Sequence, residues 1–211
     1  MGWERHRNPA ARSTAIDRIP GIDRAAPTSR PDTARIVKSK HDRDELRAEL
    51  LKRMKVDQDI REQSEDPPNQ ERMARWRNID RDNTAWLRSV VRARGWPLLS
   101  QVGEDGALAA WLLSQHADAS PEIQREFHAA LSDAVSRKEA KPAHLAYLGD
   151  RVRVNSGRPQ IYGTQFVNDG NGFRPHPIEE LDQLDDRRAA VGLEPFEEYE
   201  AQMRSLYEGD I

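Results

Sequence analysis

The residue best suited to acid–base chemistry in this chain is a histidine at the end of an apolar segment. His116 follows Leu112 by four positions and Leu113 by three, so it continues the face that these leucines would bury. Imidazole titrates near neutral pH and can serve as general acid or base, and a carboxylate from Asp118 or Asp57 could orient it. The pattern therefore indicates three catalytic residues: His116, Asp118 and Asp57. The alternative is a buried core histidine or a cation at a helix C-terminus.

A second group of polar residues ends an apolar stripe near the start of the chain. Leucines and a methionine at four-residue steps lead to Gln58, which Asp57 and Arg61 flank. Asp57 and Arg61 are four apart and can pair on one helix face, and burying them would cost several kcal/mol (on the order of 3–5) unless they were paired. A guanidinium binds carboxylate or phosphate bidentately, so we expect Arg61 and Arg151 to hold an anionic group. The alternative is an exposed ion pair.

Further polar groups gather in two later segments. Tyr147, Asp150 and Arg151 share neighbouring faces of one expected helix, and the segment Gln160-Ile161-Tyr162-Gly163-Thr164-Gln165 carries amide and hydroxyl groups. Such groups suit hydrogen bonding to a polar ligand, whereas a solvent-facing hairpin is the alternative. Gly163 weakens a strand unless another group approaches its backbone closely. The expected ligand-binding residues are Gln58, Arg61, Asn83, Tyr147, Asp150, Arg151, Tyr162, Thr164 and Gln165.

Helical periodicity accounts for most of the elements that must position these residues. It predicts helices over 41–63, from near Asp80 or earlier up to Gly95, over 104–115, over 121–137 and over 142–154. The third of these is apolar on nearly all sides, which is typical of a central, buried helix. After Gly157 the period changes, and 158–167 with 172–175 predict a short hairpin around 168–171. Two helices, 178–191 and 195–207, complete the chain.

The fold class expected from these elements is mainly α. It is an orthogonal bundle of about six to seven helices with one small β-hairpin near residues 158–175. Residues 1–40 contain four prolines and few large apolar side chains, so we expect a disordered tail there and a single helical domain over 41–211.

Composition excludes several classes of protein. The chain has 211 residues, no cysteine and a net charge of −3, and no run of apolar residues is long enough to span a membrane. Residues 1–40 hold nine basic and four acidic residues, so the remainder is acidic, which disfavours nucleic-acid binding by the folded part. We expect a cytoplasmic location, because no secretory signal is recognisable, and the basic tail could contact a protein partner. Phosphate-loop, dinucleotide and metalloprotease motifs are absent from the sequence.

Metal binding is the less favoured reading of the His116–Asp118 pair. It would require Asp57, Asp80 or Asp150 to converge on the pair, and carboxylate-rich sites with one histidine are uncommon for zinc. We therefore expect no cofactor and no metal ligands, with a divalent metal as the alternative.

The order of these motifs resembles a bacterial family known only as a domain of unknown function. The resemblance covers about residues 44–200 and leaves out the basic tail. It implies the domain boundaries but no activity. The motifs that carry it are Asp57-Gln58-x-x-Arg61, Asp80-x-x-Asn83, Gln115-His116-Ala117-Asp118, Ala146-Tyr147-Leu148-x-Asp150-Arg151 and Gln160-Ile161-Tyr162-Gly163-Thr164-Gln165.

Three functions remain open from the sequence. The first is a small enzyme of hydrolase, lyase or isomerase type that acts on a small anionic or polar substrate through His116. The second is a non-catalytic module that binds a polar ligand or a peptide. The third is a purely structural role, in which Asp57–Arg61 and Asp150–Arg151 are buried pairs that fix helix register.

Overall fold

The protein is mainly α-helical, and the computed structural model describes residues 39–62, 69–169 and 172–208. The expected basic tail up to residue 38, the break at Pro67 and Pro68, and positions 170–171 of the hairpin turn lie outside the described residues. The elements are α1 (Lys40–Glu62), α2 (Gln70–Arg94), α3 (Leu99–Gln115), α4 (Pro121–Ser136), α5 (Pro142–Asn155), β1 (Phe166–Asn168), β2 (Phe173–Pro175), a 3-10 helix η1 (Leu181–Gln183), α6 (Leu184–Ala190) and α7 (Phe196–Glu208).

The long helix α2 begins well before Asp80 because a side chain caps its first turn. The Asn69 carboxamide oxygen accepts a hydrogen bond from the backbone N–H of Arg72 at 2.8 Å. Helix α2 ends at a glycine, as predicted: Gly95 adopts a φ of 80° and donates its N–H to the Val91 carbonyl. Arg72 also ties the two long helices together, because its guanidinium donates to the Ile60 carbonyl at the end of α1.

The central helix is α3, as its nearly uniform hydrophobicity predicts. It contacts α1, α2, α4 and α5, and it begins at Leu99 rather than Glu104 because a kink at Gly103, with φ of 71°, joins two helical segments. The core lies among α1–α5. Burial of a large apolar side chain there stabilises the fold by about 1.5–3 kcal/mol. Its fully buried large members are Leu50, Leu87, Val102, Leu113, Phe127, Leu131 and Leu148.

The predicted hairpin exists, but its first strand is shorter than expected. β1 pairs antiparallel with β2 in the register Val167–Arg174, whereas 158–165 is irregular apart from one parallel bridge between Gln160 and Ile178. The strand prediction for 158–165 was wrong because side chains, rather than a neighbouring strand, satisfy the backbone N–H groups of this segment.

The sixth predicted helix, 178–191, is also shorter than expected. Glu180 adopts a left-handed conformation with φ of 43° and ψ of 69°, which no helix can contain. The chain therefore forms η1 and then α6, and Gly192 follows the end of α6 as predicted.

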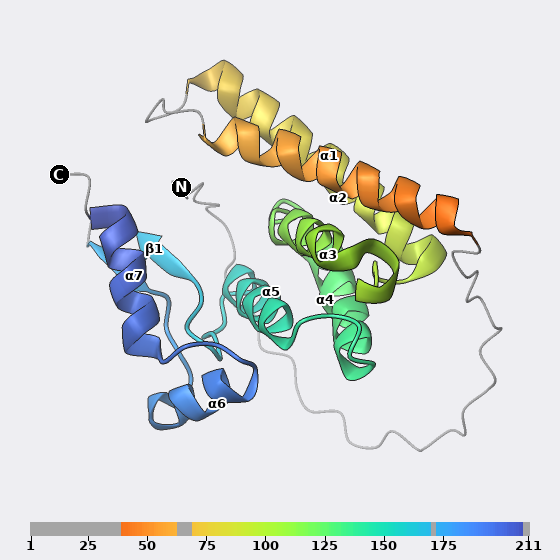
Figure 1. Ribbon diagram of the computed structural model, residues 1–211. Coiled ribbons are helices and arrows are strands. Elements are labelled where there is room, and N and C mark those ends of the chain that lie inside the picture. The colour runs from red at the N-terminus through yellow and green to blue at the C-terminus, as the bar shows by residue number, and fades with distance from the viewer. Residues whose placement is uncertain (1–38, 63–68, 170–171, 209–211) are drawn as a thin grey trace, which may run out of the picture.

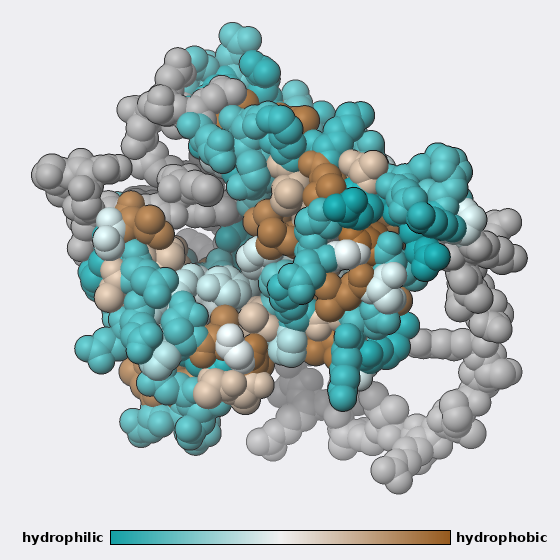
Figure 2. All heavy atoms as spheres, in the orientation of Figure 1, coloured by the Kyte–Doolittle hydropathy of each residue, from teal (hydrophilic) through white to brown (hydrophobic). Residues whose placement is uncertain are grey.

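The helices run in several directions, and the elements fall into two groups in Figure 1. α1 and α2 lie side by side above α3, while α6, α7 and the hairpin lie on the far side of α5. The face seen in Figure 2 is largely hydrophilic, with hydrophobic areas separated by polar ones. Within the described residues, no helix has the length and hydrophobicity needed to cross a membrane.

Candidate functional site

His116 lies where α3 ends, and a buried side chain fixes this end. His116 caps α3 with φ of −88° and ψ of 10°, so the backbone leaves the helix at this residue. The Gln124 side-chain amide, fully buried on α4, donates to the carbonyls of Ser114 at 3.3 Å and Gln115 at 3.2 Å. These bonds satisfy carbonyls that the last turn of a helix leaves unpaired, and they hold His116 in place.

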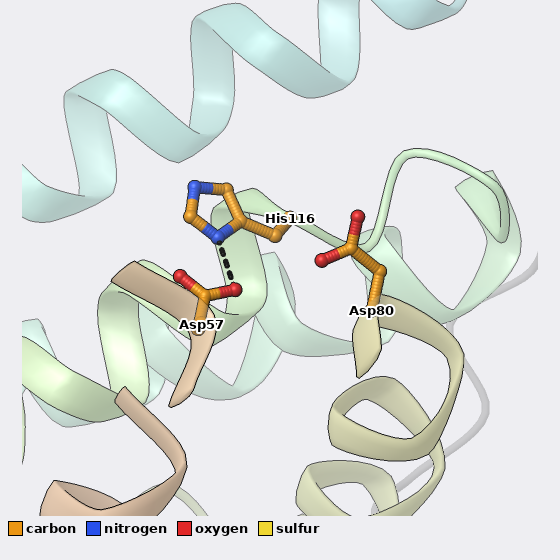
Figure 3. Close-up of side chains that lie close together, drawn as sticks. All are labelled: Asp57, Asp80 and His116. Carbon is orange, nitrogen blue, oxygen red and sulfur yellow. Dashed lines mark hydrogen bonds and ion pairs between the residues drawn. The ribbon is translucent and has the colours of Figure 1, made fainter. Parts of the chain in front are cut away.

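The imidazole of His116 is bound to a carboxylate from a different helix. His116 Nδ1 and Asp57 Oδ1 are 2.8 Å apart, and both residues are buried. Figure 3 shows the ring turned so that its second nitrogen, Nε2, points away from Asp57 and Asp80. The structure thus brings together two of the three residues predicted as catalytic, which lie 59 positions apart in sequence.

Arg61 joins the same cluster and connects α1 to α2. Its guanidinium donates to Asp57 Oδ1 at 2.5 Å and to Asp80 Oδ1 at 2.6 Å, and it lies 4.8 Å from the centre of the Trp76 ring. Gln58 donates to the other oxygen of Asp57 at 2.7 Å. The predicted Asp57–Arg61 pair is confirmed, and its burial makes it part of a charged network on three helices rather than a surface pair.

Burial and charge shift the protonation equilibria of this network. Burial is the main reason that the pKa of His116 is lowered. The hydrogen bond that His116 donates to Asp57 opposes this change, and the positive charge of Arg61 adds to it. Burial likewise raises the pKa of Asp80, although Arg61 opposes this. The imidazole is therefore neutral near pH 7, and its Nδ1–H faces Asp57.

Asp57, Asp80 and His116 are also near enough to one another to be considered as metal ligands. Each offers one ligand atom, and these atoms lie within 4.8 Å of one another. Arg61, however, already donates to both carboxylates, so a metal ion would have to displace a buried guanidinium. The expectation that the protein uses no metal stays a prediction.

Asp118 does not orient His116, although the His-x-Asp spacing predicted that it could. The Asp118 carboxylate instead accepts two hydrogen bonds from the Arg151 guanidinium, one of them at 2.7 Å. Burial raises the pKa of Asp118, but Arg151 and the amides of Asn155 and Gln124 outweigh burial, so the pKa is lowered overall. The turn after His116 points the Asp118 side chain towards α5, whereas α1 supplies the carboxylate for the imidazole.

Arg151 links Asp118 to the segment that carries the predicted hydroxyl and amide groups. Its Nη1 donates to the Gln165 side-chain oxygen at 3.0 Å. The proposed Asp150–Arg151 pair is not formed, because consecutive residues on a helix point in different directions and Arg151 pairs with Asp118. Asp118, Arg151 and Gln165 thus form a second cluster next to the His116 network.

Asp150 has a different environment from the one expected of a ligand-binding residue. It is fully buried and accepts hydrogen bonds from the backbone N–H groups of Ile161, Tyr162 and Thr164, and from the Thr164 hydroxyl. Burial raises its pKa, and these hydrogen bonds oppose the change. Asp150 therefore holds the segment that carries Gln165. The Thr164 hydroxyl and the Tyr162 backbone N–H, both in residues predicted to bind a ligand, donate to the Asp150 carboxylate.

The two remaining residues predicted for ligand binding lie elsewhere. The Tyr147 ring packs edge-on against Trp111 and Tyr199, so it joins α3, α5 and α7. Asn83 is buried between the long helices, where its oxygen accepts from Arg53 at 3.0 Å. Its Nδ2 has no hydrogen-bond partner among the described residues.

Several buried polar residues of the site were not predicted. Gln124 shares an apolar stripe with Phe127 and Leu131, and this polar interruption could have been noticed. Arg188 is fully buried and donates to the Tyr162 carbonyl at 2.5 Å. Arg188 lies in a short run of charged residues, so the sequence gives no sign that its side chain is buried.

The fold and the cluster define a mainly helical protein with a buried carboxylate–histidine–guanidinium network. The chain belongs to the family of unknown function DUF6624, whose model matches residues 44–210. This match confirms the expectation, from the sequence, of a family known only as a domain of unknown function. Comparisons with curated proteins and with solved structures found no match.

Proposed function

We propose that the chain is an enzyme in which His116 acts as a general base and acid, with Asp57 as its orienting carboxylate. The observation that carries the proposal is the buried hydrogen bond of 2.8 Å between Asp57 Oδ1 and His116 Nδ1. A carboxylate on Nδ1 holds the proton there, so Nε2 keeps the lone pair that accepts a proton from water or substrate.

The electrostatics around the imidazole support a base that starts neutral. A carboxylate alone would raise the pKa of its histidine partner, but Arg61 offsets the charge of Asp57 and burial disfavours the imidazolium. A base that is neutral over the physiological range can accept a proton without first losing one. The chemistry would be of hydrolase, lyase or isomerase type on a small polar or anionic substrate, in the cytoplasm.

A binding module without chemistry is the second candidate. It is favoured by the cluster of Asp118, Arg151 and Gln165, whose hydrogen-bonding groups can hold a polar ligand whether or not His116 reacts. A protein partner of the basic tail belongs to the same proposal.

The experiment that separates the two is a turnover screen on the full chain with matched histidine variants. The panel contains carboxylic esters, phosphate esters, amides and α-proton exchange substrates. We expect His116→Gln to lower kcat/KM at least about 100-fold, because general acid–base catalysis contributes about 10²–10⁴-fold. The control is His41→Gln, because His41 is an exposed residue of α1 paired with Glu45.

The pH profile gives a second readout that a structural role would not change. The ascending limb of kcat/KM should lie below pH 6.5, the ordinary imidazole pKa, because burial lowers that of His116. Turnover that survives His116→Gln would disprove the enzyme proposal. Ligand binding without turnover in the wild type would support the module instead.

A further inference from the structure

Arg61 and Arg151, the two arginines expected to hold an anionic group, differ in how much of their side chains is exposed to solvent. The Arg61 side chain is 3% exposed and binds both Asp57 and Asp80, so its charge is committed inside the network. The Arg151 side chain is 13% exposed, and that of its partner Asp118 is 34% exposed. A ligand arriving from solvent therefore meets the Arg151–Asp118 pair rather than Arg61.

The guanidinium of Arg151 is held in the geometry that an anion requires. Its Nε and Nη2 both donate to the Asp118 carboxylate, the first at 2.7 Å, which is the bidentate arrangement that guanidinium makes with carboxylate or phosphate. Its Nη1 donates to the Gln165 oxygen at 3.0 Å, and this bond fixes the plane of the group.

The Asp118 carboxylate has other hydrogen-bond donors besides Arg151. The Asn155 amide donates to it at 2.8 Å, and the Gln124 amide donates at 3.2 Å. If another anion took its place on Arg151, Asp118 would keep these donors and its contact with solvent. The exchange leaves both the guanidinium and the carboxylate with hydrogen bonds, which avoids the cost of an unpaired buried charge.

The pair also lies beside the proposed base. Asp118 follows His116 by two residues in the turn that ends α3, and the positive charge of Arg151 acts on His116. A group bound to Arg151 would thus place the rest of its molecule next to the imidazole.

We propose that Arg151 and Gln165 form the subsite for an anionic group of the substrate, a carboxylate or a phosphate, and that Asp118 is the internal carboxylate which this group displaces. The inference deepens the proposed function and rests on it, since the bound molecule is a substrate only if His116 acts on it. The substrate class is then a small molecule with one anionic group close to its reacting atom.

The test is anion binding to the full chain, measured by calorimetric titration. The probes are sodium phosphate and sodium acetate, each compared with sodium chloride at the same ionic strength. Arg151→Lys should weaken binding at least about tenfold, because an ammonium cannot form the bidentate pair. Asp118→Asn should tighten it at least about threefold, because the internal competitor is lost.

The matched control is Arg92→Lys, since Arg92 forms an exposed pair with Glu126 and should leave the titration unchanged. Thermal unfolding followed by circular dichroism shows whether each variant is folded. A folded Asp118→Asn that binds the probes no more tightly than the wild type overturns the proposal. The same holds if Arg151→Lys binds as the wild type does, or if neither probe binds the wild type.

The two probes also distinguish the kind of group. Tighter binding of phosphate indicates a phosphorylated substrate, and tighter binding of acetate indicates a carboxylate, so either supports the subsite. The titration needs no turnover, so it tests anion binding at Arg151 separately from catalysis by His116. If His116→Gln shows that the enzyme proposal is wrong, the titration still shows whether Arg151 binds an anion.

Discussion

At the scale of single residues, the protonation of His116 depends on charges that oppose one another. Asp57 favours the imidazolium through its hydrogen bond, while burial and the charges of Arg61 and Arg151 disfavour it. The guanidinium of Arg61 is the part of this balance that mutation can remove without touching the imidazole, because Arg61 binds Asp57 and Asp80 rather than His116.

We expect Arg61→Gln to raise the pKa of His116, because the Asp57 charge is then unopposed by Arg61. The variant should also lower the free energy of unfolding by about 3–5 kcal/mol, since one partner of a buried pair is lost. An NMR titration of the imidazole signals measures the first effect, and urea denaturation measures the second. Arg92→Gln is the control, and a downward move of the His116 pKa would contradict this account.

At the scale of elements, residues 160–165 connect the helical core to the C-terminal elements. Asp150 on α5 accepts the N–H of Tyr162, and Arg188 on α6 donates to its carbonyl. The Tyr199 hydroxyl on α7 donates to the Thr164 carbonyl at 3.1 Å. This segment positions Gln165 only because α5, α6 and α7 all hold it.

Removal of the Asp150 carboxylate should therefore be costly. Asp150→Ala leaves at least three backbone N–H groups without their acceptor, so we expect a loss of about 3 kcal/mol or more in the free energy of unfolding. Asp133→Ala, at an exposed pair with Arg137, should cost less than about 1 kcal/mol. Equal urea midpoints for the two variants would show that Asp150 does not hold the segment.

The glycine of the same segment allows a second, independent prediction. A Cβ at Gly163 would lie 2.7 Å from Phe196 on α7, whereas a Cβ at Gly157 meets nothing within 4 Å, and both residues have φ of 69°. Gly157→Ala should thus cost about 1 kcal/mol from backbone strain alone. Gly163→Ala should cost about 1–3 kcal/mol more from overpacking. Similar thermal midpoints for the two variants would exclude the close approach of Phe196.

At the scale of the whole molecule, burial favours the neutral form of four histidine side chains. Burial lowers the pKa of His116, His128, His144 and His176, and that of His144 falls to about 4. The His144 ring stacks on Trp111 with ring centres 4.5 Å apart. Because the unfolded chain binds protons at these histidines near pH 6.5 and the folded chain binds them only at lower pH, their protonation destabilises the fold as the pH falls below about 6.5.

We expect the free energy of unfolding to fall as the pH is lowered from about 6.5 to about 4. A pKa unit corresponds to about 1.4 kcal/mol, but His144 is partly exposed, so its share is about 1–2 kcal/mol. His144→Phe keeps a ring on Trp111 and should flatten the profile, while His41→Phe should follow the wild type. An unchanged slope in His144→Phe would show that other groups cause the acid sensitivity.

The sequence alone determined the elements whose signals are local. Apolar residues at helical spacing, Gly95 and Gly192 after helix ends, and the prolines that open α4 and α5 predicted most helices and a small hairpin. Local patterns also predicted the Asp57–Arg61 pair, because four-residue spacing on a helix brings two side chains together whatever the rest of the fold does.

Only the tertiary structure decided which partners the polar residues have on other elements. Asp57 rather than Asp118 binds His116, and Asp118 rather than Asp150 binds Arg151, because these contacts join residues that lie on different elements. The sequence of 158–165 predicts a strand. In the structure, however, the Asp150 carboxylate accepts the backbone N–H groups of this segment that a neighbouring strand would otherwise accept. Sequence spacing fixes which residues share a helix face, but the packing of helices fixes which faces meet.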